Sequence, residues 1–92
     1  MSSLNEQVAK ACDWLSVPDA EHDLAMAWRA YEVVRGRGWR IWHCQDYSGP
    51  GLGMWCVVLS RPSEEAYGEG ATFPAALCAA IVKAAERRDD GK

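Results

Sequence analysis

The sequence has no long hydrophobic run and no large excess of charge of either sign. Its longest uninterrupted apolar segments, Phe73–Val82 and Met54–Leu59, fall well short of the roughly 20 residues that cross a bilayer. Residues 1–10 lack the cationic and then apolar pattern of a secretion signal, so we expect a cytoplasmic protein with no membrane contact. The net charge of −3 supplies no positive field for non-specific binding to nucleic-acid phosphates or anionic lipid.

The chain is also too short for two hydrophobic cores. Its 92 residues, 49% hydrophobic and 25% charged, are typical of one globular domain. A domain of this size buries only about 60 to 68% of the surface that its unfolded chain exposes, which leaves little room for an enzyme cleft. We therefore expect a single domain over residues 1–92, with a short solvated tail at residues 89–92.

Closely spaced cysteine pairs are absent. None of the four cysteines forms a C-x-x-C motif. In a reducing compartment the expectation is free thiols, with Cys12 and Cys78 packed in the core as small apolar residues. The spacing of Cys44 and Cys56 is compatible with opposition across a hairpin, and whether they pair is left open.

A zinc site has little support from the sequence. His43, Cys44 and Cys56, with His22 as a fourth ligand, are the residues that a hairpin could bring together. Structural zinc sites usually contain closely spaced ligand pairs, which these residues do not form. We expect no metal and no cofactor.

Two helices are predicted in the first 40 residues. Ser3 followed by Glu6 forms a capping-box pattern, and apolar residues at spacings of three and four predict a helix over about Asn5 to Leu15. Asp19 is the expected N-cap of a second helix, which ends at the glycines that begin with Gly36.

Three strands and a last helix are predicted in the second half. Trp39–Cys44 and Met54–Leu59 are rich in aromatic and branched residues and are separated by a segment with glycine and proline, which indicates a hairpin with a long loop. Glu64–Gly70 predicts a short third strand at an exposed edge. Thr72 is the expected cap of an alanine-rich helix that runs to about Arg88 and can approach a sheet closely.

The segment Met54–Leu59 shows no polar alternation, so both of its faces are apolar. Exposing one face would place three bulky residues in water, at a cost of roughly 1.5 to 3 kcal/mol each. We therefore expect an α+β fold in the order α-α-β-β-(β)-α. Its expected architecture is a three-layer α-β-α sandwich, with a small antiparallel sheet of two or three strands covered by helices on both faces. In that arrangement Val57→Asp and Val58→Asp both destabilise strongly.

Three segments resemble a known family. They are Asn5–Ala9 with Trp14, Ala25–Val34 leading to Gly38–Trp39, and Ala71–Ala80, in which threonine and proline precede an alanine-rich helix with an apolar residue and a cysteine. In these segments the chain resembles the phage alpha-beta-alpha sandwich domain family of small phage and prophage proteins. The resemblance implies a three-layer fold and a phage setting. It carries over no catalytic residues, because members of that family are mostly uncharacterised.

No residue pattern indicates catalysis. His43 and Cys44 are adjacent on a predicted strand, so their side chains point to opposite faces. The glycine-rich segment 49–53 has neither P-loop nor dinucleotide-binding spacing, and no nucleophile elbow is present. We expect that the protein is not an enzyme.

Nucleic-acid binding is a minor alternative. The order of a helix, three strands and a final helix resembles that of double-stranded RNA-binding domains, which place cations at the start of the last helix. Ala71–Ala80 contains no lysine or arginine. A basic stretch nevertheless lies between the second helix and the first strand, and it comprises Arg29, Arg35, Arg37 and Arg40.

The five tryptophans suit either a core or a binding surface. The candidate partner-binding residues are Trp42, Tyr47, Leu52 and Trp55, in the hairpin and its loop. We expect a phage or prophage accessory protein that binds a host or phage protein, with inhibition of a host enzyme or antiviral defence system as its leading role. The alternatives are a virion or assembly component and an RNA- or DNA-binding module, and a homodimer is left open.

Overall fold

The computed structural model describes residues 3–46 and 54–87, and the expected tail at residues 89–92 lies outside these ranges. The helices are α1 (Leu4–Ala11), α2 (Leu24–Arg35) and α3 (Phe73–Arg87), and the strands are β1 (Arg40–Asp46), β2 (Trp55–Arg61) and β3 (Glu64–Gly70). The strands form one antiparallel sheet in the order β1-β2-β3. The α+β class, the element order and the third strand are confirmed.

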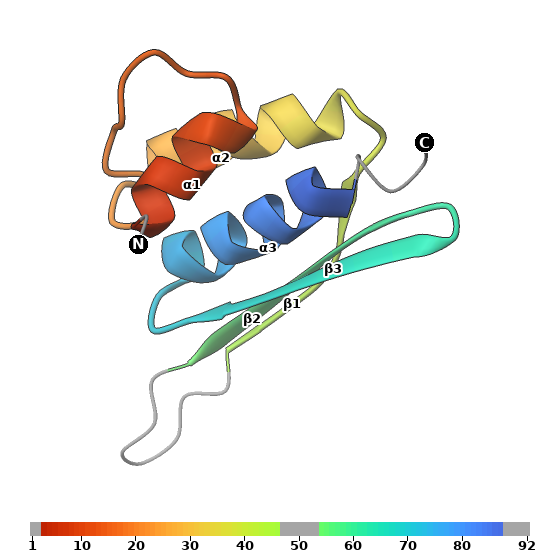
Figure 1. Ribbon diagram of the computed structural model, residues 1–92. Coiled ribbons are helices and arrows are strands. Elements are labelled where there is room, and N and C mark those ends of the chain that lie inside the picture. The colour runs from red at the N-terminus through yellow and green to blue at the C-terminus, as the bar shows by residue number, and fades with distance from the viewer. Residues whose placement is uncertain (1–2, 47–53, 88–92) are drawn as a thin grey trace.

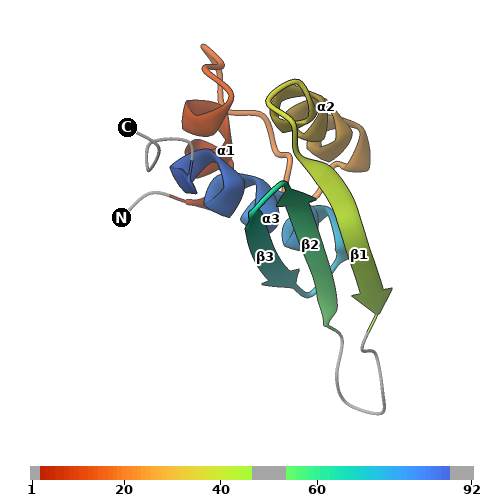
Figure 2. The same ribbon diagram turned by 90° about the vertical axis from the view of Figure 1, so that its right-hand side faces the viewer.

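The layers stack in a different order from the expected sandwich. All three helices lie on one side of the sheet (Figures 1 and 2). Helix α3 packs directly on β2 and β3, and α1 and α2 pack against α3 on its other side. The order is therefore two helices, one helix and then the sheet, and no helix within the described residues covers the opposite face of the sheet.

Helix α3 is the centre of the core because it is apolar on almost every side. Leu77, Ile81 and Ala84 have no exposed surface, and a helix that is hydrophobic all round must be buried. The sheet covers one side of α3 and the pair α1 and α2 covers the other. Fully buried side chains from the other elements complete this core: Val8, Val34, Trp39, Val57 and Leu59.

The contact between α3 and β3 is unusually close. A Cβ atom added to Gly68 would lie 2.2 Å from the backbone nitrogen of Ala80 and 2.5 Å from the carbonyl oxygen of Ala76. A Cβ atom at Gly70 would lie 2.8 Å from the Cβ atom of Ala75. The expected close approach of the alanine-rich helix is confirmed, and the glycines of β3 make that approach possible.

The first helix is shorter than its periodicity indicated. Asp13 has a φ of 58°, and the amides of Asp13 and Trp14 donate to the carbonyl oxygens of Lys10 (3.2 Å) and Ala9 (2.8 Å). This pair of hydrogen bonds closes the helix in a Schellman motif at Ala11. The predicted end at Leu15 was therefore wrong, and the Leu15 side chain is exposed.

The second helix starts at Leu24 and not at Asp19. The carboxylate of Asp23 accepts hydrogen bonds from the amides of Ala25 (3.0 Å) and Met26 (3.4 Å), and so caps the helix. Asp19 instead accepts a hydrogen bond from the Asn5 side chain at 3.0 Å, which with His22 lowers the pKa of the Asp19 carboxyl. Thr72 caps α3 as expected, since its hydroxyl accepts from the amide of Ala75 at 3.3 Å.

We expect Gly68→Ala to destabilise the protein by about 3 kcal/mol or more, because the new Cβ atom meets backbone atoms of α3 that cannot rotate away. The matched control is Gly36→Ala. Gly36 has a right-handed helical conformation and its added Cβ atom would lie 3.4 Å from the nearest atom, so a change within about 1 kcal/mol is expected. Urea denaturation of both variants measures the difference, and equal midpoints would contradict the close approach.

Val57→Asp and Val58→Asp should have unequal effects, contrary to the expectation for a sheet covered on both sides. Val57 is fully buried, whereas Val58 is half-buried on the side of the sheet away from α3. An unpaired carboxylate at position 57 should lower the free energy of unfolding by several kcal/mol, which is on the order of the protein's whole stability. The same carboxylate at position 58 should lower it markedly less. Thermal melts of the two variants test this, and equal losses would show that the second face is also covered.

Candidate functional site

We call the side of the sheet away from α3 the open face. Gly68 lies against α3 and pairs with Val57, and neighbouring residues along each strand point to the other side. The open face therefore carries Arg40, Trp42, His43 and Gln45 of β1, Cys56, Val58 and Ser60 of β2, and Glu65, Tyr67 and Glu69 of β3, with Met54 just before β2.

A bulge places Trp42 on the open face. The register passes from the Ile41–Leu59 pair directly to the His43–Val58 pair, so Trp42 is the additional residue. Bulges redirect side chains, and the Trp42 side chain is 71% exposed. It lines a shallow depression of about 580 Å³ together with five residues at the β2–β3 turn: Ser60, Arg61, Ser63, Glu64 and Glu65.

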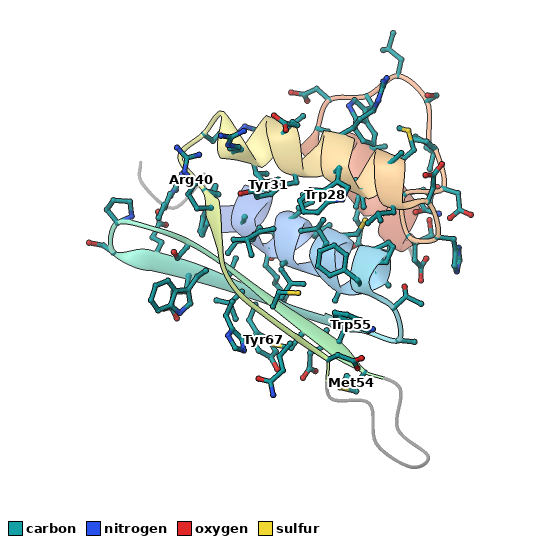
Figure 3. All side chains as sticks on the ribbon, turned by 180° about the vertical axis from the view of Figure 1, so that it is seen from behind. Trp28, Tyr31, Arg40, Met54, Trp55 and Tyr67 are labelled. Carbon is teal, nitrogen blue, oxygen red and sulfur yellow. The ribbon has the colours of Figure 1, made fainter. Side chains whose placement is uncertain are left out.

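Tyr67 lies opposite Val58, in the middle of the edge strand β3, and is 50% exposed. Figure 3 shows Tyr67 and Met54 on the far side of the sheet from Trp28 and Tyr31. The Tyr67 hydroxyl donates to Glu69 Oε2 at 2.6 Å. Its pKa is raised first by a hydrogen bond with the Cys56 thiol and then by the bond to Glu69. Cys56 is only 1% exposed, although no helix in the described part of the chain covers it.

The four predicted partner-binding residues do not all reach this surface. Trp42 is exposed and lies on the open face. Trp55 is half-buried and packs on Phe73 with ring centroids 5.7 Å apart, so it belongs to the side of the sheet that faces the helices. Trp55 therefore does not lie on the open face, because its strand alternates and position 55 shares a face with Val57. Tyr47 and Leu52 lie outside the described residues.

Tyr67, Glu65 and Glu69 were missed as members of the surface. The signal for them was in the sequence: in Glu64–Gly70 the residues Ala66, Gly68 and Gly70 alternate with these larger polar ones. Small residues on one face permit a close helix, and large polar residues on the other suit solvent. That alternation indicates a sheet covered on one side.

Two of the four arginines in the expected basic stretch contact other groups of the protein. Arg37 donates to the carbonyl oxygen of Ala11 at 3.2 Å, and Arg35 lies 3.9 Å from Glu32. Arg29 and Arg40 are exposed. The start of α3 carries no cation, as the sequence shows.

The cysteines are all free. Cys12, Cys56 and Cys78 are buried, and burial raises the pKa of Cys12 to about 11 and that of Cys78 to about 12. Cys44 is exposed and pairs in register with Val57, whereas Cys56 pairs with Gln45, so the two thiols point to opposite faces. Within residues 3–46 and 54–87, no three His, Cys, Asp or Glu side chains are grouped to hold a metal ion.

Comparisons with protein-family models, with curated protein sequences and with solved structures found no match to this chain. In the described ranges no helix has both the length and the apolar character needed to cross a membrane. What the chain does is therefore inferred from the open face itself.

Alkylation should distinguish the exposed thiol from the buried ones. We expect iodoacetamide to modify native Cys44 first, slowly because its pKa is raised by partial burial and by Cys56, and to leave the other three thiols unmodified until unfolding. Peptide mass spectrometry before and after addition of urea measures this. Rapid native modification of Cys56 would show that Tyr67 and its neighbours do not cover it.

Proposed function

We propose that this protein is a non-enzymatic protein-binding domain and that the open face is its binding surface. The observation that carries the proposal is Trp42, a large aromatic side chain held 71% exposed by a bulge, on a sheet face that no described helix covers. Tyr67 and Met54 extend the exposed apolar surface across the three strands. Large aromatic and apolar side chains that are exposed on one face are typical of interaction sites.

The residue types on this face suit binding to another protein. Tryptophan and tyrosine are the side chains that most often dominate binding energy, because each buries a large area with few rotatable bonds. Truncating such an anchor typically costs about 2 to 4 kcal/mol of binding free energy. A rigid strand holds Tyr67, and its bond to Glu69 fixes the hydroxyl.

The same face offers little for catalysis. The depression beside Trp42 is shallow and is lined by serine, arginine and glutamate side chains. The histidine nearest to it in sequence, His43, is hydrogen bonded to Gln45 at 3.0 Å, and His22, which does not line this depression, is 2.9 Å from Asp19.

The biological setting comes from the sequence resemblance and from the free thiols. In the proposed setting, the chain is a phage or prophage accessory protein that acts in the host cytoplasm and inhibits a host enzyme or antiviral defence system. A virion or assembly component would use the same face against a neighbouring subunit.

Site-specific crosslinking tests the proposal. A photo-crosslinking amino acid at Gln45, on the open face, should capture a protein partner in the cells that produce this chain, and one at Glu86, exposed on α3, should not. Trp42→Ala should reduce the crosslinked product at position 45 by about tenfold or more, because it removes the anchor. Leu15→Ala removes another exposed apolar side chain and serves as the control.

Two results would contradict this assignment. One is an identical crosslinking pattern from positions 45 and 86. The other is a product at position 45 that Trp42→Ala leaves unchanged while circular dichroism shows both proteins to be folded.

A further inference from the structure

The open face has an apolar residue on its central strand, as do sheet faces that are covered by another layer. Val58 is half-buried on the central strand, between Tyr67 on one side and the Trp42 bulge on the other. A sheet usually buries each apolar face against another layer, and helices are the common cover for small sheets. An extended peptide would pair with an edge of the sheet, whereas a helix lies across its face.

The β3 side of the open face is acidic. Glu65 and Glu69 are both exposed and occupy the same face on either side of Tyr67. Four residues along a strand separate them, which corresponds to about 13 to 14 Å. The Tyr67 hydroxyl holds the Glu69 carboxylate at 2.6 Å. This row therefore presents two negative charges with an aromatic ring between them.

The geometry points to a helix of a partner protein, amphipathic and cationic, as the occupant of the open face. Its apolar side covers Trp42, Val58 and Tyr67, and its lysine or arginine side chains pair with Glu65 and Glu69. A separation of 13 to 14 Å corresponds to about nine helical residues, so the paired cations lie about two and a half turns apart. This inference rests on the proposed function and specifies the chemistry of the partner.

Charge disfavours the other occupants. Nucleic-acid phosphates would be repelled by both carboxylates. A second copy packed face to face would place four carboxylates against the two Arg40 side chains in one interface, and the chain as a whole carries a net charge of −3. A cationic helix instead gains attraction along β3 in addition to the apolar contact.

A displayed library of amphipathic helices tests the inference on the full chain. The apolar positions are fixed as leucine, and the polar positions are randomised among Lys, Arg, Glu, Asp, Gln and Ser. Clones are selected on the native protein, and those that still bind Trp42→Ala are discarded. We expect the retained clones to be enriched in lysine and arginine, and Glu65→Gln/Glu69→Gln to weaken their binding about tenfold at low salt.

The control variant Glu32→Gln/Glu86→Gln removes the same charge from exposed positions on α2 and α3, and it should leave binding within about twofold. Retained clones with neutral or acidic polar positions would overturn the inference and leave the proposed function standing. If no Trp42-dependent clone is recovered, both fail. A concentration-dependent dimer that Trp42→Ala abolishes would assign the open face to a second copy and would also overturn the inference.

Discussion

The contact between α3 and β3 determines the rest of the architecture. Because Gly68 and Gly70 have no side chains, the backbone of α3 comes close enough to β3 for any added Cβ atom to overlap Ala75, Ala76 or Ala80. One side of α3 is thereby buried in the sheet, and its other side is also apolar and needs cover. Helices α1 and α2 supply that cover. The described chain then has no helix left for the second face of the sheet, so the open face is a consequence of how α3 is buried.

Much of this fold could be predicted from local patterns. The order of the elements, the Thr72 cap and the close approach of an alanine-rich helix all follow from residue types that act over a few positions. The layer order could not be obtained from β2 alone, because apolar residues occur on both of its faces. Cys56 is small enough to be covered by Tyr67, which makes an apolar position compatible with an uncovered face. The small-and-large alternation in β3 was the better indicator, because it reports directly which face a helix can approach.

The ends of α1 and α2 depend on interactions that periodicity does not report. Leu15 follows the apolar spacing of α1, but the left-handed conformation of Asp13 ends that helix first. Asp19 is a suitable cap by residue type, but its carboxylate instead accepts a hydrogen bond from the Asn5 side chain. The Asn5 side chain also accepts a hydrogen bond from the amide of Glu21 at 2.8 Å, and the two bonds fix the connection between the two helices. The exposure of Trp42 has a similar origin, since it depends on a register shift against β2 that involves residues distant in sequence.

The two faces of the sheet therefore have separate roles. The face against α3 contributes the stability, through fully buried side chains such as Val57 and Leu59 and through glycines that admit no substituent. The open face contributes little packing, so an exposed tryptophan and a row of carboxylates can occupy it at small cost to folding. Trp42 is one of the large apolar side chains that the described part of the chain leaves exposed, and the core is complete without it. The core does not require Trp42, and a bulge holds it outward, so it is available to bind a partner. Because the two faces of the sheet have separate roles, residues of the binding surface can change without loss of the fold.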